Sequence, residues 1–146
     1  MTKDPGRRAC LLIIEDNPGD VTLLGLALQQ AEVRCDVSVI EDGGAALEFL
    51  KQEKPRIPDL VVLDLNLPKA DGREVLYAMR SIEAFANVPV VIWTSSNAPH
   101  ERAQLKALGV TRYLVKPPDL NEFLKLGGVI KDVLEECERN SAALDR

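Results

Sequence analysis

Histidine is scarce in this chain of 146 residues, and so are other building blocks of common functional sites. His100 is the only histidine, which leaves too little material for a histidine-rich metal site or a serine–histidine–aspartate triad. Aromatic residues make up 4% of the sequence, so few rings are available to sandwich a flavin. We interpret the three cysteines as reduced structural thiols, because they have neither metal-ligand spacing nor an even number: Cys10, Cys35 and Cys137.

Long apolar runs are also absent, since none approaches the roughly 18 residues that a membrane-spanning helix needs. The first eight residues are polar, and the sequence predicts a cytoplasmic protein without a membrane segment. A net charge of −5, without a basic stripe, argues against direct binding to nucleic acid. The length predicts one domain over residues 9–138, with flexible termini at 1–8 and 139–146.

Short apolar runs alternate five times with helical patterns. Two of the runs, 11–14 and 60–63, have no polar residue to face water, which is typical of parallel strands covered by helices on both faces. Strands are predicted at 9–15, 35–40, 60–64, 88–94 and 112–115, and helices at 18–31, 43–53, 72–82, 99–108 and 119–138. The pattern predicts an α/β fold, a doubly wound five-stranded parallel sheet of the (βα)5 flavodoxin-like type with strand order 2-1-3-4-5.

Polar residues and glycines mark the ends of the predicted helices. Asn17, Asp42 and Asp71 each stand where a side chain can cap free backbone N–H groups. Gly109 is placed to end the fourth helix. Gly127-Gly128, inside the last predicted helix, either breaks that helix or permits close approach of another backbone.

The last predicted helix has more apolar surface than one sheet would cover. Val129, Val133 and Cys137 widen its apolar arc to roughly 220°. From this arc we predict a homodimer or partner surface, with the homodimer formed through the fifth strand and the fourth and fifth helices. The alternative is that the C-terminal tail or the fourth helix covers the arc.

Two of the apolar runs end in acidic residues: Glu15 and Asp16 follow the first run, and Asp64 follows the third. The predicted strand order makes these runs neighbours, so the three carboxylates meet at the crevice where ligands usually bind. Each pair of carboxylates repels by about 4 kcal/mol at about 4 Å and an effective dielectric constant near 20. A hard divalent cation with oxygen ligands would offset this repulsion, and Mg²⁺ is the predicted ion.

Four strand ends carry short motifs in a fixed order: Glu15-Asp16, Asp64 with Leu67-Pro68, Thr94-Ser95 and Lys116-Pro117. Any one of these motifs is weakly specific, but the set is strongly so. Over nearly its whole length the chain resembles the receiver domain of bacterial two-component response regulators.

The resemblance implies a phosphorylation switch in a phosphorelay. Asp64 would accept a phosphoryl group from a sensor histidine kinase or a histidine phosphotransfer protein, and the output would be regulated binding of a downstream protein target. Mg²⁺ would be held by Glu15, Asp16, Asp64 and the backbone carbonyl of Asn66. The chain would thus be a signalling protein rather than a metabolic enzyme, although it would catalyse its own phosphorylation and slow dephosphorylation.

Three further residues have roles implied by the resemblance. Lys116 would present its charge, and Thr94 its hydroxyl, to the phosphoryl oxygens. Tyr113, three residues before Lys116, would turn inward on phosphorylation and remodel the surface of the fourth helix, fifth strand and fifth helix.

Simpler interpretations exist for each residue taken singly. Asp16 could be only a helix cap, Lys116 a solvated loop residue, and Thr94 a residue chosen for β propensity. Tyr113 could be a half-buried packing residue, and Trp93 is interpreted as core. Joint placement on one rim favours the functional interpretation for the first three.

Loop and helix residues add a resemblance to receivers that work with phytochrome-type sensor kinases. The segments are 51–58, 64–69 and 71–76.

Three alternatives to the receiver stay open at this point: a dehalogenase-like phosphohydrolase, a flavodoxin-like electron carrier, and a scaffold that works without phosphorylation. The phosphohydrolase expects Asp-x-Asp after the first strand, where this chain has Glu15-Asp16-Asn17.

Overall fold

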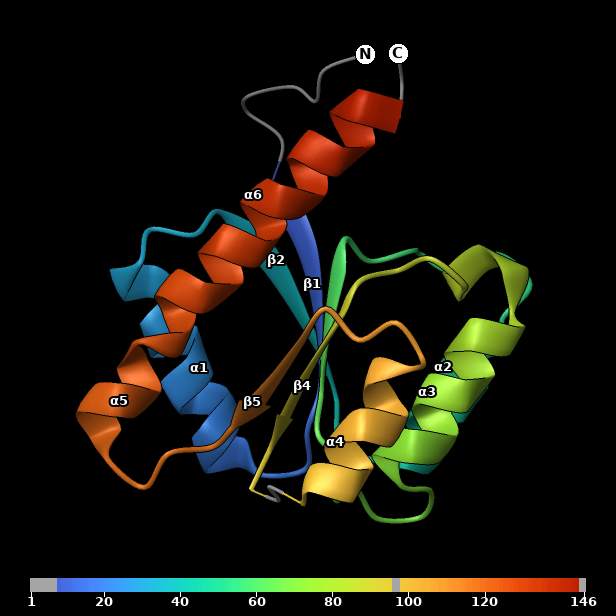
Figure 1. Cartoon of the computed structure of the whole chain (residues 1–146), viewed down its shortest axis with the longest axis horizontal. Helices are drawn as coiled ribbons and strands as arrows, with labels where there is room; N and C mark the ends of the chain where they lie inside the picture. Colours follow the sequence, from blue (N-terminus) through green and yellow to red (C-terminus); the bar gives the residue numbers. More distant parts are fainter. Residues whose placement is uncertain (1–7, 96–97, 145–146) are drawn as a thin grey trace.

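Five parallel strands form one sheet in the order β2-β1-β3-β4-β5, as the sequence predicts (Figure 1). The computed structural model describes residues 8–95 and 98–144. The strands are β1 (Ala9–Ile14), β2 (Cys35–Ile40), β3 (Leu60–Leu63), β4 (Val90–Thr94) and β5 (Arg112–Val115). Because all five run in the same direction, their carboxyl ends share one rim of the sheet.

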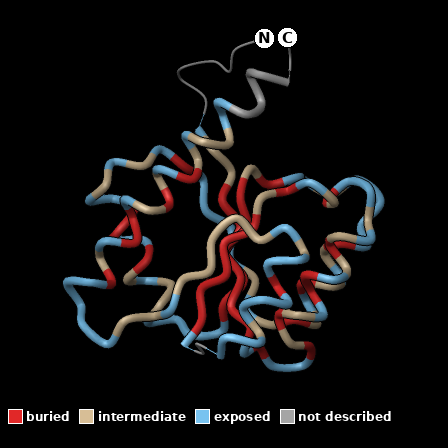
Figure 2. The backbone as a smooth tube through the Cα atoms, in the orientation of Figure 1, coloured by how far each residue is buried: buried red, intermediate tan, exposed pale blue. Residues whose placement is uncertain are grey.

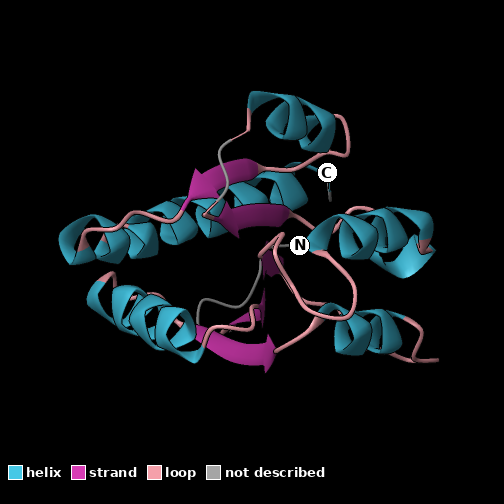
Figure 3. Cartoon of the chain, turned by 90° about the horizontal axis from the view of Figure 1, so that it is seen from below, coloured by secondary structure: helices cyan, strands magenta, loops and turns pink. Residues whose placement is uncertain are grey.

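Helices cover both faces of this sheet (Figure 3). They are α1 (Pro18–Gln30), α2 (Gly43–Leu50), α3 (Gly72–Ser81), α4 (Pro99–Lys106), α5 (Leu120–Leu124) and α6 (Leu126–Leu144), with a 3-10 helix η1 (Glu83–Phe85). α1, α5 and α6 pack on one face, and α2, α3 and α4 on the other. In the described part of the chain, no helix combines the length and the apolar character needed to cross a bilayer.

The middle of the sheet is the core of the protein. Every residue of β3 and β4 is buried, and the buried stretches of the chain run through the centre of the fold (Figure 2). Successive side chains alternate between the two faces. Leu60 and Val62 join the cluster under α1 and α6, whereas Val61 and Leu63 join the cluster under α2 and α3. Burial on both faces explains why these strands are apolar, apart from Thr94 at the carboxyl end of β4.

The predicted helix caps are confirmed. The side chains of Asn17, Asp42 and Asp71 accept hydrogen bonds from the first backbone N–H groups of α1, α2 and α3. Gly109 follows α4 with a φ of +78°, a left-handed conformation in which glycine carries no steric penalty. The helix predicted over 43–53 ends earlier, at Leu50, where Lys51 closes it with N–H bonds to carbonyls of the last turn.

The last predicted helix, 119–138, is two helices. α5 ends at Leu124, and the N–H of its C-cap residue, Lys125, donates to the carbonyls of Glu122 and Phe123, so the break precedes the glycine pair. α6 then continues to Leu144, and the C-terminal segment predicted to be flexible from 139 is helical as far as that residue. Of the other residues predicted to be flexible, which are 1–8 and the end of the chain, 1–7 and 145–146 lie outside the described residues.

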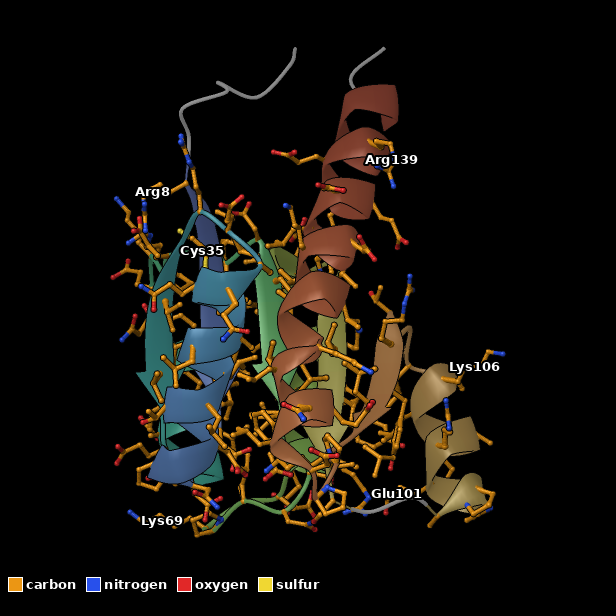
Figure 4. All side chains as sticks on the ribbon, turned by 90° about the vertical axis from the view of Figure 1, so that its left-hand side faces the viewer. Arg8, Cys35, Lys69, Glu101, Lys106 and Arg139 are labelled. Carbon is orange, nitrogen blue, oxygen red and sulfur yellow. The ribbon has the colours of Figure 1, made fainter. Side chains whose placement is uncertain are left out.

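Gly127 is the point where α6 meets α1. A Cβ added there would lie 2.0 Å from the carbonyl oxygen of Ala27, so the glycine permits the close backbone approach that was one of the two expectations. Figure 4 shows the two helices side by side in front of the sheet. Val133 is 0% exposed and Val129 is partly buried. α1 and the sheet therefore cover the apolar arc at Val133, where its interpretation as a free partner surface was wrong.

We predict opposite effects for two neighbouring substitutions in α6. Gly127→Ala should destabilise the fold by about 1–3 kcal/mol, because the methyl group must push α1 and α6 apart. Gly128→Ala is the matched control: its Cβ meets nothing within 4 Å, and alanine should be neutral or stabilise the helix by about 0.5–1 kcal/mol. Urea unfolding of both variants measures this, and equal midpoints would contradict the close contact.

Candidate functional site

The acidic residues after β1 and β3 meet on the rim. The register pairs Ile14 with Leu63, so Glu15 and Asp64 begin side by side, and the Asp64 N–H donates to the Ile14 carbonyl at 3.0 Å. Carboxylate oxygens of Glu15, Asp16 and Asp64 all lie within 4.8 Å of one another. Glu15 is 1% exposed and Asp64 4% exposed, whereas Asp16 is open to solvent. The predicted convergence of the three acids is confirmed.

Local structure at the start of α1 leaves the Asp16 carboxylate free for this cluster. The N-cap is Asn17, whose side chain accepts from the N–H groups of Gly19 and Asp20 at 2.9 and 3.2 Å. The simpler interpretation of Asp16 as the cap is therefore wrong. The Asn17 N–H also donates to Glu15 at 3.1 Å and helps to orient the buried carboxylate.

Two glycines hold the loop between β3 and α3 in place. A Cβ on Gly72 would lie 2.2 Å from the Asp64 carbonyl oxygen, and one on Gly43 would lie 1.7 Å from the Ala70 carbonyl oxygen. Only glycine allows the helix starts to pack this closely on the loop. Within the loop, the Asn66 N–H donates to the Asp64 carboxylate at 3.1 Å, and its side chain is exposed.

Lys116 brings a positive charge into the acidic cluster. Its backbone N–H donates to the Thr94 carbonyl at 2.7 Å, which fixes the start of its side chain beside β4. Its Nζ lies 2.8 Å from Glu15, 2.9 Å from Asp20 and 3.2 Å from Asp64. The side chain is 13% exposed, so the interpretation of Lys116 as a solvated loop residue is wrong.

Sequence reasoning missed Asp20. This residue lies in the first turn of α1 rather than at a strand end, so it carries none of the rim motifs. A signal was present in its position three residues after the Asn17 cap, which can place an acid of the first turn near the same rim. The side chain of Asp20 is 21% exposed, and its carboxylate contacts Lys116 from the helix side.

The pKa values of Glu15 and Lys116 are both raised, which favours the neutral form of the acid and the charged form of the lysine. Burial raises the pKa of Glu15 to about 7; the nearby Asp64 carboxylate adds to this effect, and the hydrogen bond from Lys116 opposes it. For Lys116, burial opposes the charge, but hydrogen bonds to Glu15 and Asp20 and the charge of Asp64 raise its pKa above the ordinary value. Lys116 therefore stays cationic throughout the physiological range.

Thr94 and Tyr113 project from the other face of the sheet, towards α3 and α4. The register pairs Tyr113 with Ile92, two residues before Thr94. Thr94 is 0% exposed, and its hydroxyl lies 3.5 Å from the side-chain nitrogen of Asn66. The Tyr113 hydroxyl donates to Glu101 at 3.3 Å, and the Arg102 guanidinium lies 5.2 Å from the ring centre.

Glu101 connects this tyrosine to a second charged residue. Arg73, in the first turn of α3, forms an ion pair with Glu101 of α4, and its guanidinium also lies 3.5 Å from Asp71. Figure 4 shows Glu101 at the same end of the molecule as Lys69, where the strands reach their carboxyl ends. Sequence reasoning missed the pair, because its members lie 28 residues apart on two helices.

The cluster fits a hard divalent cation. Oxygen donors from three carboxylates lie close enough together to share one ion, and oxygen is the ligand that Mg²⁺ and Mn²⁺ accept. Exposure of Asp16 leaves one side of the cluster open to solvent, from which an ion can enter.

Comparisons with known proteins agree with this site. The family model described as the response regulator receiver domain matches residues 11–126. The response regulator Rcp1 of Synechocystis is 35% identical over 121 residues, which cover 80% of this chain and 82% of that protein.

Two solved structures share the fold. The phosphorylated cyanobacterial phytochrome response regulator RcpA superposes with a TM-score of 0.79 at 32% identity, covering 86% of this chain and 93% of that one. The Mn²⁺-bound form of Rcp1 superposes with a TM-score of 0.77 at 32% identity, covering 84% and 91%.

The raised pKa of Glu15 predicts a pH dependence of stability in the metal-free protein. An ordinary glutamate has a pKa of 4.5, and in the folded chain it is about 7. Between these values the folded state holds a proton that the unfolded state has lost, so the free energy of unfolding falls as pH rises from 4.5 to 7.

Substitution of Glu15 tests this dependence. Glu15→Gln cannot ionise, so its free energy of unfolding should fall less than that of the wild type across the same interval. Urea unfolding with a chelator present measures both proteins at several pH values. Glu53→Gln, at an exposed loop position, is the control and should behave like the wild type. Parallel curves for Glu15→Gln and wild type would contradict the assignment.

Proposed function

The chain belongs to the response regulator receiver family, and we propose that it is a phosphorylation switch whose acceptor is Asp64. The observation that carries this proposal is the placement of the Asp64 carboxylate at the end of β3. It stands 3.2 Å from the Lys116 ammonium and shares its rim with Glu15 and Asp16. A carboxylate in such surroundings can act as a nucleophile towards phosphorus.

In the proposed reaction a carboxylate oxygen of Asp64 forms a bond to phosphorus, and the phosphorus–nitrogen bond of a phosphohistidine breaks. The donor histidine recovers the electron pair and takes up a proton. Phosphoryl transfer asks mainly for positioning and charge compensation, and Lys116 offers both to the equatorial oxygens. Glu15, Asp16, Asp64 and the Asn66 carbonyl would hold Mg²⁺, which supplies further charge neutralisation when bound.

The proposed output begins at Thr94 and Tyr113. A charge-assisted hydrogen bond from the Thr94 hydroxyl to a phosphoryl oxygen is worth about 1.5–3 kcal/mol, enough to shift a two-state equilibrium roughly tenfold to 150-fold. Both side chains lie on the face towards α3 and α4, which supports a coupled movement. Tyr113 would exchange its bond to Glu101 for an inward position and thereby alter the surface of α4 and β5.

A groove beside Tyr113 supports a protein partner. It encloses about 380 Å³ and is lined by Arg102, Lys106 and Arg112 as well as the tyrosine. Its basic lining suits an acidic surface on the downstream target. Val115 and Leu120 are 36% and 54% exposed near the same edge. Their exposure is in keeping with the homodimer predicted through β5, α4 and the last predicted helix, which is α5 and α6 in the structure.

The similarity to the phytochrome response regulator RcpA supports a phytochrome-type histidine kinase as the phosphoryl donor. The exchange would take place in the cytoplasm. Family membership sets aside the electron carrier and the dehalogenase-like phosphohydrolase, which belong to other families. A scaffold that works without phosphorylation remains the rival, and labelling of Asp64 separates the two.

Phosphorylation should depend on Asp64. With Mg²⁺ and acetyl phosphate as donor, the wild type should acquire one phosphoryl group, and Asp64→Asn should acquire none, because an amide is a poor nucleophile. Asp132→Asn, at an exposed position on α6, is the matched control and should label normally. Intact-protein mass spectrometry counts the groups; equal labelling of Asp64→Asn and wild type would refute the acceptor.

Loss of the Glu101 acceptor should release Tyr113. The chain has two tyrosines, and Tyr77 is 59% exposed, so fluorotyrosine labelling provides a switch signal and an internal reference for ¹⁹F NMR. Beryllofluoride with Mg²⁺ should move the Tyr113 resonance and leave that of Tyr77 in place. In the unphosphorylated state, Glu101→Gln should raise the inward population about tenfold, since a bond to a charged group is worth about 1.5 kcal/mol or more.

Glu122→Gln is the control for this experiment, because Glu122 is exposed and its ion pair is with the nearby Lys125. Its Tyr113 resonance should match that of the wild type. A Tyr113 signal that ignores both beryllofluoride and Glu101→Gln would count against the switch.

A further inference from the structure

Trp93 is the only tryptophan of the chain, and it is buried directly behind the rim. The side chain is 1% exposed, which confirms its interpretation as a core residue. Its ring packs edge to face against Phe123 of α5, with the centroids 5.2 Å apart. The indole N–H has no hydrogen-bond partner among the residues that the structure describes. A buried donor without an acceptor is costly, so hydrogen bonding does not account for an indole here.

Lys116 contacts the face of the indole, and this contact explains better why a tryptophan stands here. The register pairs Trp93 with Leu114, and Lys116, two residues further, projects from the same face of the sheet. The Lys116 ammonium lies 4.8 Å from the centre of the Trp93 ring. A cation at this distance over an aromatic face is attracted by the negative potential of the ring, most strongly for tryptophan.

Asp20 holds the same ammonium from the side of α1, with Nζ 2.9 Å from its carboxylate. The cluster of three acids that fits a metal ion does not include Asp20. Glu15 and Asp64, by contrast, belong to that cluster and also bind Lys116. A cation bound among the acids would therefore compete for two of the lysine's three carboxylate partners.

We propose that Trp93 and Asp20 are positioning residues that hold the Lys116 ammonium at the rim when Glu15 and Asp64 are engaged elsewhere. A lysine side chain has four rotatable bonds, and fixing it costs rotamer entropy. The ring face and the Asp20 carboxylate offset this cost without drawing on the metal ligands. The inference rests on the proposed function, since it assigns Lys116 to the phosphoryl oxygens.

The position of the ammonium can be read without any phosphorylation. Protons on Cε of Lys116 lie near the indole face, so its ring current should move their NMR signals upfield. In wild type this upfield shift should persist when Mg²⁺ saturates the site. In Trp93→Leu it should vanish, and in Asp20→Asn it should shrink on Mg²⁺ addition. A wild-type signal that loses its upfield position with Mg²⁺ would overturn the proposed positioning of Lys116 by Trp93 and Asp20, whether or not Asp64 is the acceptor.

The rate of phosphorylation tests whether this positioning of Lys116 matters for the reaction. With saturating Mg²⁺, Trp93→Leu should slow phosphorylation by acetyl phosphate about three- to tenfold, in line with the strength of a buried cation–π contact. Trp93→Phe keeps a ring face and should restore most of the rate; it also covers the case in which Trp93→Leu does not fold.

A double-mutant cycle separates positioning from packing. If Trp93 acts through Lys116, Trp93→Leu should cause no further loss of rate in a Lys116→Met background, because the group that it positions is gone. A purely structural role predicts that the two losses multiply. Multiplicative losses, or a Trp93→Phe rate as low as that of Trp93→Leu, would overturn the proposal.

Discussion

The meeting of three carboxylates with one ammonium is the interaction on which the rim depends. Glu15, Asp16 and Asp64 crowd together because β1 and β3 are adjacent and parallel. Burial raises the pKa of Glu15, and the neighbouring Asp64 carboxylate adds to this effect. Lys116 makes the arrangement tolerable by contacting two of the three acids directly. The fold therefore holds the acids in place at an electrostatic cost that a cation relieves, which is why the same rim suits both a divalent ion and a phosphoryl group.

The alternation of side chains in β4 and β5 divides the surroundings of this rim into two sides. Thr94 and Tyr113 face α3 and α4, where they meet Glu101 and its ion pair with Arg73. Trp93 and Lys116 face α1, α5 and α6. Residues next to each other in a strand thus serve different roles: Thr94 is placed to respond to phosphorylation, and Trp93 to position the Lys116 ammonium. A substitution on one face of the sheet need not disturb the other face.

Sequence reasoning reached the strand order, the helix caps and the convergence of the acids, because each depends on local pattern or on neighbouring strand ends. It placed Lys116 at the correct rim but did not find Asp20, whose approach depends on the tilt of α1. The Arg73–Glu101 pair and the Trp93–Lys116 contact depend on how separate elements pack, which periodicity does not encode. The arc on the last helix was misread for the same reason: only the packed structure shows that Gly127 lets α1 cover Val133.

The Gly127 contact anchors the start of α6 against α1. The helix extends from Leu126 to Leu144, so its far end lies about 25 Å beyond the point where it touches Ala27. Val133 is buried further along the same helix, so α6 is held against α1 and the sheet at more than this one contact. Asp20 lies near the start of α1 and Ala27 near its end, so this one helix joins the acidic rim to the place where α6 is anchored.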